Sequence, residues 1–258
     1  MNLAFDKTIR EIAVENPATI RVFERFGIDY CCGGRKSLDA ACAELQLDVD
    51  QVREKLDEAT RHPGDADQVD WSSASLAKVI QHIVRQHHAY VRGESPRLRE
   101  LAAKVRARHE TLHPELREVQ TLVDILADEM SAHMLKEEQV LFPFIARMEH
   151  DLSTGQPLPP AYFGTVANPV RMMIGEHESA GAILAELRKI TNNFQPPADA
   201  CSSFRGLYAG IADFEKDLHM HVHLENNVLF PRAQELEAKN GGARQAAAPG
   251  LACGSAER

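Results

Sequence analysis

Apolar residues recur at helical spacing along most of this chain, whereas the period-two alternation of half-buried strands is hardly visible. Long helical patterns are predicted over residues 72–93, 114–149, 168–193 and 200–238. Residues 95–110 could form a separate helix or extend the first pattern. Four long helices joined by short breaks predict an all-α fold, a four-helix bundle.

A small helical domain is predicted ahead of the bundle. Asn16-Pro17 resembles a helix cap followed by proline in the first turn, and Ser37 and Asp48 each precede a short helical pattern. The polar, Pro- and Gly-containing residues 61–71 are typical of a linker. The expected organisation is an N-terminal domain over residues 1–62, a bundle over 72–238 and a disordered tail over 239–258.

Charge and composition narrow the function classes. The chain has 258 residues, a formal net charge of −9 and no dense Lys/Arg run, which argues against nucleic-acid binding and against anionic membranes. No signal peptide and no apolar run of about 20 residues is visible, so a cytoplasmic location is expected. Five cysteines, two of them adjacent, do not form the pattern of a secreted disulfide framework.

One unusual phrase occurs twice. "HMLKEEQVLFP" begins at His133 and "HVHLENNVLFP" begins at His221. Because a helix turns about 100° per residue, each histidine shares a face with the glutamate four positions later, Glu137 or Glu225. Glu138 lies off that face, and its counterpart in the second copy is an asparagine. Only the glutamate that shares the histidine's face is kept in both copies.

Two further histidines complete a pattern in each half of the chain. His88 precedes the first copy, and His177 precedes the second, by almost the same number of residues. Packed hairpins could therefore aim four imidazoles and two carboxylates at one interior point. That set is too large for one tetrahedral zinc ion and suits two first-row ions such as iron or manganese. A single such His–Glu pair is usually only a surface contact, but two matching copies favour a metal site.

The order of these residues distinguishes two kinds of metal-binding bundle. Ferritin-like proteins use Glu-x-x-His, whereas this chain has His-x-x-x-Glu and is rich in histidine. Together with "GIDYCCGGRKSL" near the N-terminus, the phrases "SAHMLKEEQVLFP" and "HLENNVLFP" resemble the repair-of-iron-centres family, hemerythrin-like di-iron proteins of the nitrosative and oxidative stress response. The resemblance covers nearly the whole chain apart from the tail, which carries an additional Cys253.

The resemblance implies a hemerythrin-like bundle that holds a non-haem di-iron centre with oxo or hydroxo bridges. Glu137 and Glu225 would be bridging carboxylates. It further implies nitric oxide or dioxygen as the small ligand, damaged iron–sulfur proteins as partners, and repair that could proceed by iron donation. A carrier of nitric oxide or oxygen without a repair role, and a di-iron nitric oxide reductase, remain alternatives, and a homodimer is possible. The metal ligands implied are His88, His133, Glu137, His177, His221 and Glu225.

Several residues near the predicted ligands have two interpretations. Glu129 and Asp217 each precede a ligand histidine by four positions and could orient its imidazole, or could be ordinary surface carboxylates. His219 and His223 are expected on helix faces other than that of the ligand His221. His82 is expected in solvent or behind a ligand. Because His87 is next to His88, either could be the ligand of the first helix, and the family motif selects His88. Residues flanking the ligands could line an access path: Glu176, Glu178 and Asn226.

The adjacent cysteines Cys31 and Cys32 are equally consistent with two roles. They could be a redox- or nitrosation-sensitive thiol pair that takes part in iron transfer, or they could be small side chains packed in a tight turn ahead of the helix capped by Ser37. Cys42, Cys201 and Cys253 show no informative spacing and are predicted to have no role in the site.

Overall fold

The computed structural model describes residues 7–62, 69–157 and 161–246. Within these ranges the regular structure is helical, and the only β-type contacts are isolated bridges such as the one between Thr8 and Ser37. The predicted all-α fold is therefore confirmed.

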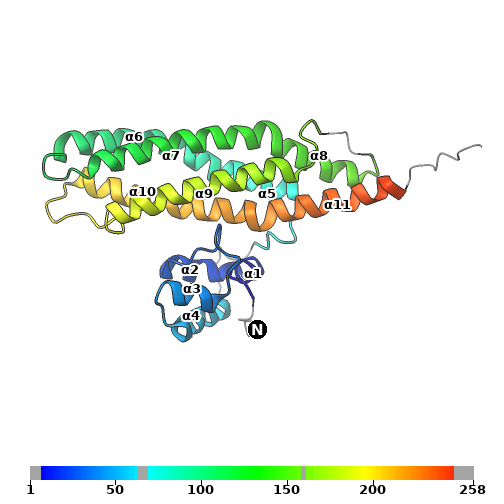
Figure 1. The fold of residues 1–258 in the computed structure, drawn as a ribbon, viewed down its shortest axis with the longest axis horizontal. Coiled ribbons are helices and arrows are strands. Elements are labelled where there is room, and N and C mark those ends of the chain that lie inside the picture. The colour runs from blue at the N-terminus through cyan, green and yellow to red at the C-terminus, as the bar shows by residue number, and fades with distance from the viewer. Residues whose placement is uncertain (1–6, 63–68, 158–160, 247–258) are drawn as a thin grey trace, which may run out of the picture.

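Four rods form the bundle, and three of them contain a π-helical turn (Figure 1). The first rod consists of α5 (Leu76–His82), the π turn η3 (Ile83–His88) and α6 (Ala89–His109). The second consists of α7 (Leu116–Lys136), η4 (Glu137–Leu141) and α8 (Phe142–Ser153). The third is α9 (Ala167–Ile190), and the fourth consists of α10 (Ser202–His223), η5 (Leu224–Leu229) and α11 (Phe230–Ala246).

The structure settles one connection that the sequence pattern left open and shifts several rod ends. The segment 95–110 extends the first rod, because α6 continues through Pro96. Asn168 and Pro169 locally resemble a helix cap followed by proline, but both lie within α9. The side chain of Asn168 donates to the carbonyl of Phe163, and α9 begins after Val166. The fourth rod continues to Ala246 instead of ending near residue 238, and the rest of the predicted tail, with Cys253, lies outside the described residues.

The apolar faces of the rods form two separate cores within the bundle. One core, which includes Leu126 and Phe204, fills the half that contains α6, α7 and α10. The other, which includes Phe142 and Phe230, fills the half that contains α5, α8 and α11. Along every rod the predicted metal ligands lie at the point where one core gives way to the other. The polar site is thus enclosed by apolar packing on both sides.

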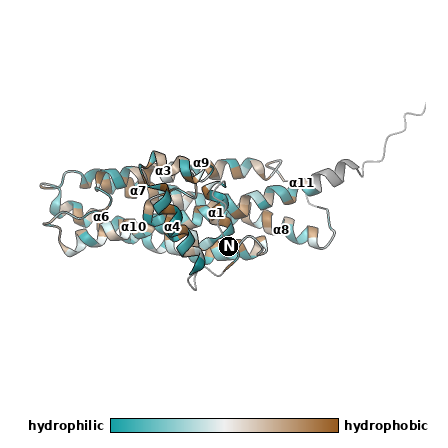
Figure 2. Ribbon diagram, turned by 90° about the horizontal axis from the view of Figure 1, so that it is seen from below, coloured by the Kyte–Doolittle hydropathy of each residue, from teal (hydrophilic) through white to brown (hydrophobic). Residues whose placement is uncertain are grey.

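The N-terminal domain has its own small core. Its helices are α1 (Ile9–Glu15), η1 (Pro17–Thr19), α2 (Ile20–Phe26), α3 (Leu38–Glu44) and α4 (Val49–Arg61). The predicted caps are present, since side-chain oxygens of Asn16, Ser37 and Asp48 each accept a backbone N–H of the helix that follows. Figures 1 and 2 show this domain against the middle of the bundle, beside α9 and α10.

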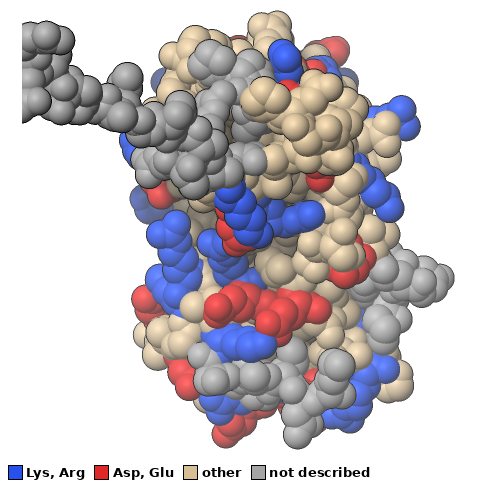
Figure 3. Space-filling view, turned by 90° about the vertical axis from the view of Figure 1, so that its right-hand side faces the viewer, with Lys and Arg blue, Asp and Glu red and all other residues tan. Residues whose placement is uncertain are grey.

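The described helices have no membrane-spanning length of apolar residues, and charged side chains of both signs lie on the surface of the bundle. No helix among the described residues is long and apolar enough to cross a membrane. Figure 3 shows Lys/Arg and Asp/Glu side chains next to one another on the end of the bundle that faces the viewer.

Candidate metal centre

The bundle brings together all six side chains predicted as metal ligands. They form two groups that could each hold a metal ion, and every member is buried. One group contains His88 and His221, and the other contains His133 and His177. Glu137 and Glu225 belong to both groups, so these carboxylates lie between the two positions.

Distances within the site show how closely the groups converge. Nε2 of His133 lies 3.2 Å from Oε2 of Glu137, and Nε2 of His177 lies 3.1 Å from Oε2 of Glu225. On the other side, Nε2 of His221 lies 2.9 Å from Oε1 of Glu225, and Nε2 of His88 lies 3.4 Å from Oε2 of Glu137. Each carboxylate therefore faces one imidazole of each group.

The π turns coincide with the site. The carbonyls of Glu137 and Glu225 accept the N–H groups of Phe142 and Phe230, five residues later. Each phenylalanine is followed by a proline, whose ring would clash in a regular α-helix with the carbonyl four residues earlier. The wider π turn relieves that clash, and such turns occur often at functional sites. The Leu-Phe-Pro part of the repeated phrase thus shapes the backbone at both shared carboxylates.

Three ligand imidazoles are oriented by a side chain behind them. Nδ1 of His88 lies 2.6 Å from Glu138, and Nδ1 of His133 lies 2.9 Å from Glu176. Nδ1 of His177 lies 3.0 Å from Oδ1 of Asn226. A partner at Nδ1 fixes the tautomer that leaves Nε2 free to bind a metal. Glu138 and Glu176 are held in turn by Arg92 and Lys136.

Of the two interpretations of Glu129 and Asp217, the structure does not support the orienting role, because neither carboxylate contacts a ligand imidazole. Glu129 accepts a hydrogen bond from Ser179, and the carboxylate of Asp217 lies 2.9 Å from Nδ1 of the neighbouring His87. The reason is geometric: with Nε2 aimed at the site, Nδ1 points toward an adjacent rod or turn and not back along its own helix. From the sequence alone, Glu176 and Asn226 are only residues that flank a ligand, and Glu138 is only a residue off the ligand face.

Burial and charge act against each other on the titratable groups. Burial favours neutral imidazoles, but Glu137 and Glu225 outweigh it and raise the pKa of His88 to about 10. Glu137, with help from Glu225 and Glu176, likewise overcomes burial and raises the pKa of His133 to about 9. Burial dominates at His221 and lowers its pKa. The surrounding histidines overcome burial at Glu225 and hold its pKa well below the usual range.

The polar atoms of the site fit a metal centre. Both side-chain oxygens of Glu137 and Oε2 of Glu225 are buried, and no described residue donates a hydrogen bond to them. Buried carboxylate oxygens without donors are costly, and metal coordination satisfies them. Imidazole and carboxylate are the ligand types typical of iron in such bundles.

Metal loading at pH 7.5 is expected to release about two protons per chain, because bound metal requires neutral imidazoles. His88 and His133, with pKa values of about 10 and about 9, carry those protons in the metal-free protein. Calorimetric titration in buffers of different ionisation enthalpy measures the number. Near pH 10.5 the release should largely disappear, and a pH-independent release would contradict this assignment.

The adjacent cysteines lie in a tight loop that faces the bundle. The carboxylate of Asp29 accepts the N–H groups of Cys31 and Cys32, each at 2.9 Å. Gly34 is needed in this turn, since a Cβ atom there would approach the carbonyl of Tyr30 to 2.7 Å. The hydrogen bond with Cys32, burial and the charge of Asp29 raise the pKa of the Cys31 thiol. Cys31 is buried, and Cys32 is partly exposed.

A cavity of about 520 Å³ lies between this loop and the bundle. Its lining includes both thiols and the ligand His177, together with residues of α9 and α10 such as Leu184 and Val222. The loop and one side of the predicted metal centre therefore border the same space.

Four histidines close in sequence to the ligands have structural partners. His87 is buried beside Asp217, and His82 packs on Trp71. His219 and His223, which were expected simply on other faces, contact the N-terminal domain through Glu24 and Tyr30. No sequence spacing signals a contact between two separately folded units.

Comparison with known proteins assigns both parts of the chain. Residues 5–60 match the family model ScdA_N, described as a domain of unknown function (DUF542), and residues 79–233 match the hemerythrin HHE cation binding domain. An iron-sulfur cluster repair protein YtfE of Musicola paradisiaca (strain Ech703) is 36% identical over 233 residues, covering 90% of this chain and 98% of the relative. Proteins of the same name from Escherichia coli O1:K1 / APEC and from Escherichia fergusonii are 36% identical over 228 residues, covering 88% of this chain and 96% of each relative. The chain therefore belongs to the family of iron–sulfur cluster repair proteins that join a DUF542 domain to a hemerythrin HHE domain.

Proposed function

We propose that this protein holds two iron ions bridged by Glu137 and Glu225 and that it helps to restore damaged iron–sulfur clusters in the cytoplasm. The observation that carries the proposal is the pair of four-residue groups that share these two buried carboxylates. Relatives that are named iron–sulfur cluster repair proteins match about nine-tenths of the chain, which supports the repair role.

Each proposed metal position has a limited number of protein ligands. Two imidazoles and two shared carboxylates leave room for a small ligand in the coordination of an iron ion. When bound, the iron pair would supply reversible binding of nitric oxide or dioxygen and a store of iron that can be donated. We therefore propose nitric oxide binding and iron donation under nitrosative or oxidative stress.

Aromatic rings and hydrogen bonds around the site hold its imidazoles in place. Phe142 packs parallel to the ring of His88, and Phe230 packs parallel to the ring of His177. Imidazoles held by apolar packing on one side and by Nδ1 hydrogen bonds on the other keep their geometry when a small ligand or an ion leaves. Cys31 and Cys32, which border the same cavity as His177, are the candidate thiols for iron transfer or for coupling to a reductant.

Incubation of the iron-loaded protein with a nitrosylated iron–sulfur enzyme tests the repair role. The proposal predicts that recovery of the client's cluster is matched by iron lost from this protein, followed with ⁵⁷Fe supplied only on the repair protein. Tight nitric oxide binding without cluster recovery would favour a carrier instead. Repeated formation of nitrous oxide with a supplied reductant would favour a nitric oxide reductase.

A further inference from the structure

The two copies of the repeated phrase differ directly after the shared glutamate. The first copy continues with Glu138, and the second continues with Asn226 and Asn227. Glu138 lies behind His88 and pairs with the exposed Arg92. Asn226 occupies the same place behind His177, but its outer side meets the N-terminal domain.

An amide fits this second place because it must both accept and donate. Oδ1 of Asn226 lies 3.0 Å from Nδ1 of His177, and its Nδ2 donates to the carbonyl of Cys31 at 3.5 Å. A carboxylate has only acceptors and could not make the second contact. Glutamate suits the first copy, where Glu138 faces the cationic Arg92, and asparagine suits the second, where Asn226 faces the carbonyl of Cys31.

The orientation of His177 fixes the orientation of the amide. Nε2 of His177 faces the site, 3.1 Å from Oε2 of Glu225, so Nδ1 carries the proton when Nε2 binds a metal. That N–H donates to Oδ1 of Asn226, which turns Nδ2 toward Cys31. One side chain thus connects a ligand imidazole with the backbone of the cysteine loop.

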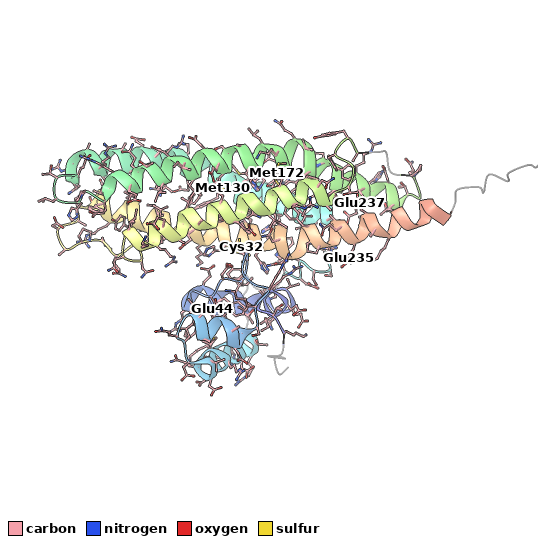
Figure 4. All side chains as sticks on the ribbon, viewed as in Figure 1. Cys32, Glu44, Met130, Met172, Glu235 and Glu237 are labelled. Carbon is pink, nitrogen blue, oxygen red and sulfur yellow. The ribbon has the colours of Figure 1, made fainter. Side chains whose placement is uncertain are left out.

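The next residue holds the same loop without touching a ligand imidazole. Nδ2 of Asn227 donates to the carbonyl of Tyr30 at 2.9 Å and also lies 2.9 Å from Nδ1 of His223. Successive asparagines of η5 therefore contact successive carbonyls of the loop, which Asp29 keeps tightly folded. Figure 4 shows Cys32 where the N-terminal domain meets the bundle.

We propose that Asn226 is a positioning residue that couples the seating of the Cys31–Cys32 loop to the metal position held by His133 and His177. The inference rests on the metal centre of the proposed function and not on the repair activity. Among the described residues, the position held by His88 and His221 has no such connection, because Glu138 faces Arg92 and Nδ1 of His221 has no hydrogen-bond partner. The two metal positions are therefore inequivalent toward the N-terminal domain.

Coupling between two sites is reciprocal. If a seated loop favours metal at His177, then bound metal favours a seated loop and protects the partly exposed Cys32 from reagents. Loading with ferrous iron under anaerobic conditions is expected to slow alkylation of Cys32 by N-ethylmaleimide about fivefold, the lower end of typical coupling strengths. Fragment-ion mass spectrometry of the peptide that carries both cysteines assigns the label to Cys31 or Cys32, and iron content is measured on the same samples.

Asn226→Asp is the deciding variant, since it keeps the acceptor for His177 and removes the donor to Cys31. Iron binding should persist, whereas the difference in Cys32 alkylation between loaded and metal-free protein should disappear. Asn227→Ala is the matched control: it loosens the loop in both states, so alkylation should rise in both while their ratio stays near fivefold.

Persistence of the full protection in iron-loaded Asn226→Asp would overturn the coupling, as would equal alkylation rates of loaded and metal-free wild-type protein. Loss of most of the iron from Asn226→Asp would contradict it too, because this variant keeps the acceptor for His177 and should weaken iron binding at that position only about fivefold. A wild-type protein without iron would instead count against the proposed function itself.

Discussion

Replacing Glu225 with alanine is expected to remove both metal ions and not just one. Glu225 belongs to both four-residue groups, whereas each histidine belongs to only one. Loss of a shared carboxylate also leaves several imidazoles without their compensating charge, because Glu225 faces His88, His177 and His221. Iron content should fall from about two ions per chain to nearly none, as measured by elemental analysis after anaerobic loading.

Two further variants show whether the loss of both ions is specific to a shared carboxylate. His88→Ala should lose mainly one ion, since His133 and His177 keep their group. Glu129→Ala should keep both, because this exposed carboxylate contacts Ser179 and no ligand. Circular dichroism controls for folding. Retention of one ion in Glu225→Ala would show that the carboxylate is not shared.

Phe230→Ala is expected to cause a large loss of stability in the metal-free protein. The ring is buried in the core around α8 and α11. It lies parallel to the ring of His177, and the two ring centroids are 6.2 Å apart. Removing a buried phenylalanine side chain costs roughly 3–5 kcal/mol through lost apolar contacts and the cavity left behind. Chemical denaturation of metal-free protein measures the change without a contribution from metal binding.

Tyr162→Ala provides the surface control for that measurement. Its side chain is 86% exposed, so the free energy of unfolding should change by less than about 0.5 kcal/mol. A similar change in both variants would mean that the Phe230 ring is not part of a packed core.

Helical spacing was sufficient to predict the groups that converge in the bundle. His133 and Glu137 share a face because they are four residues apart, and the repeat supplied the second pair. Geometry within one helix follows directly from the spacing of residues in the sequence. The rod ends were less predictable, because Asn168 resembles a helix cap locally but hydrogen-bonds to the preceding loop in the folded chain.

Contacts between distant segments could not be read from spacing. Glu176 orients His133 from another rod, and Asn226 reaches Cys31 in another domain. An orienting role for Glu129 or Asp217 would require each imidazole to hydrogen-bond to a carboxylate on its own helix. An imidazole whose Nε2 points into a bundle turns Nδ1 toward its neighbours, so the packing of the rods decides its partner.

Iron analysis combined with low-temperature Mössbauer spectroscopy of the loaded protein tests the carboxylate-bridged metal pair most directly. The account predicts about two iron ions per chain with magnetic coupling between them, because Glu137 and Glu225 belong to both positions. One ion per chain, or two magnetically isolated ions, would contradict it.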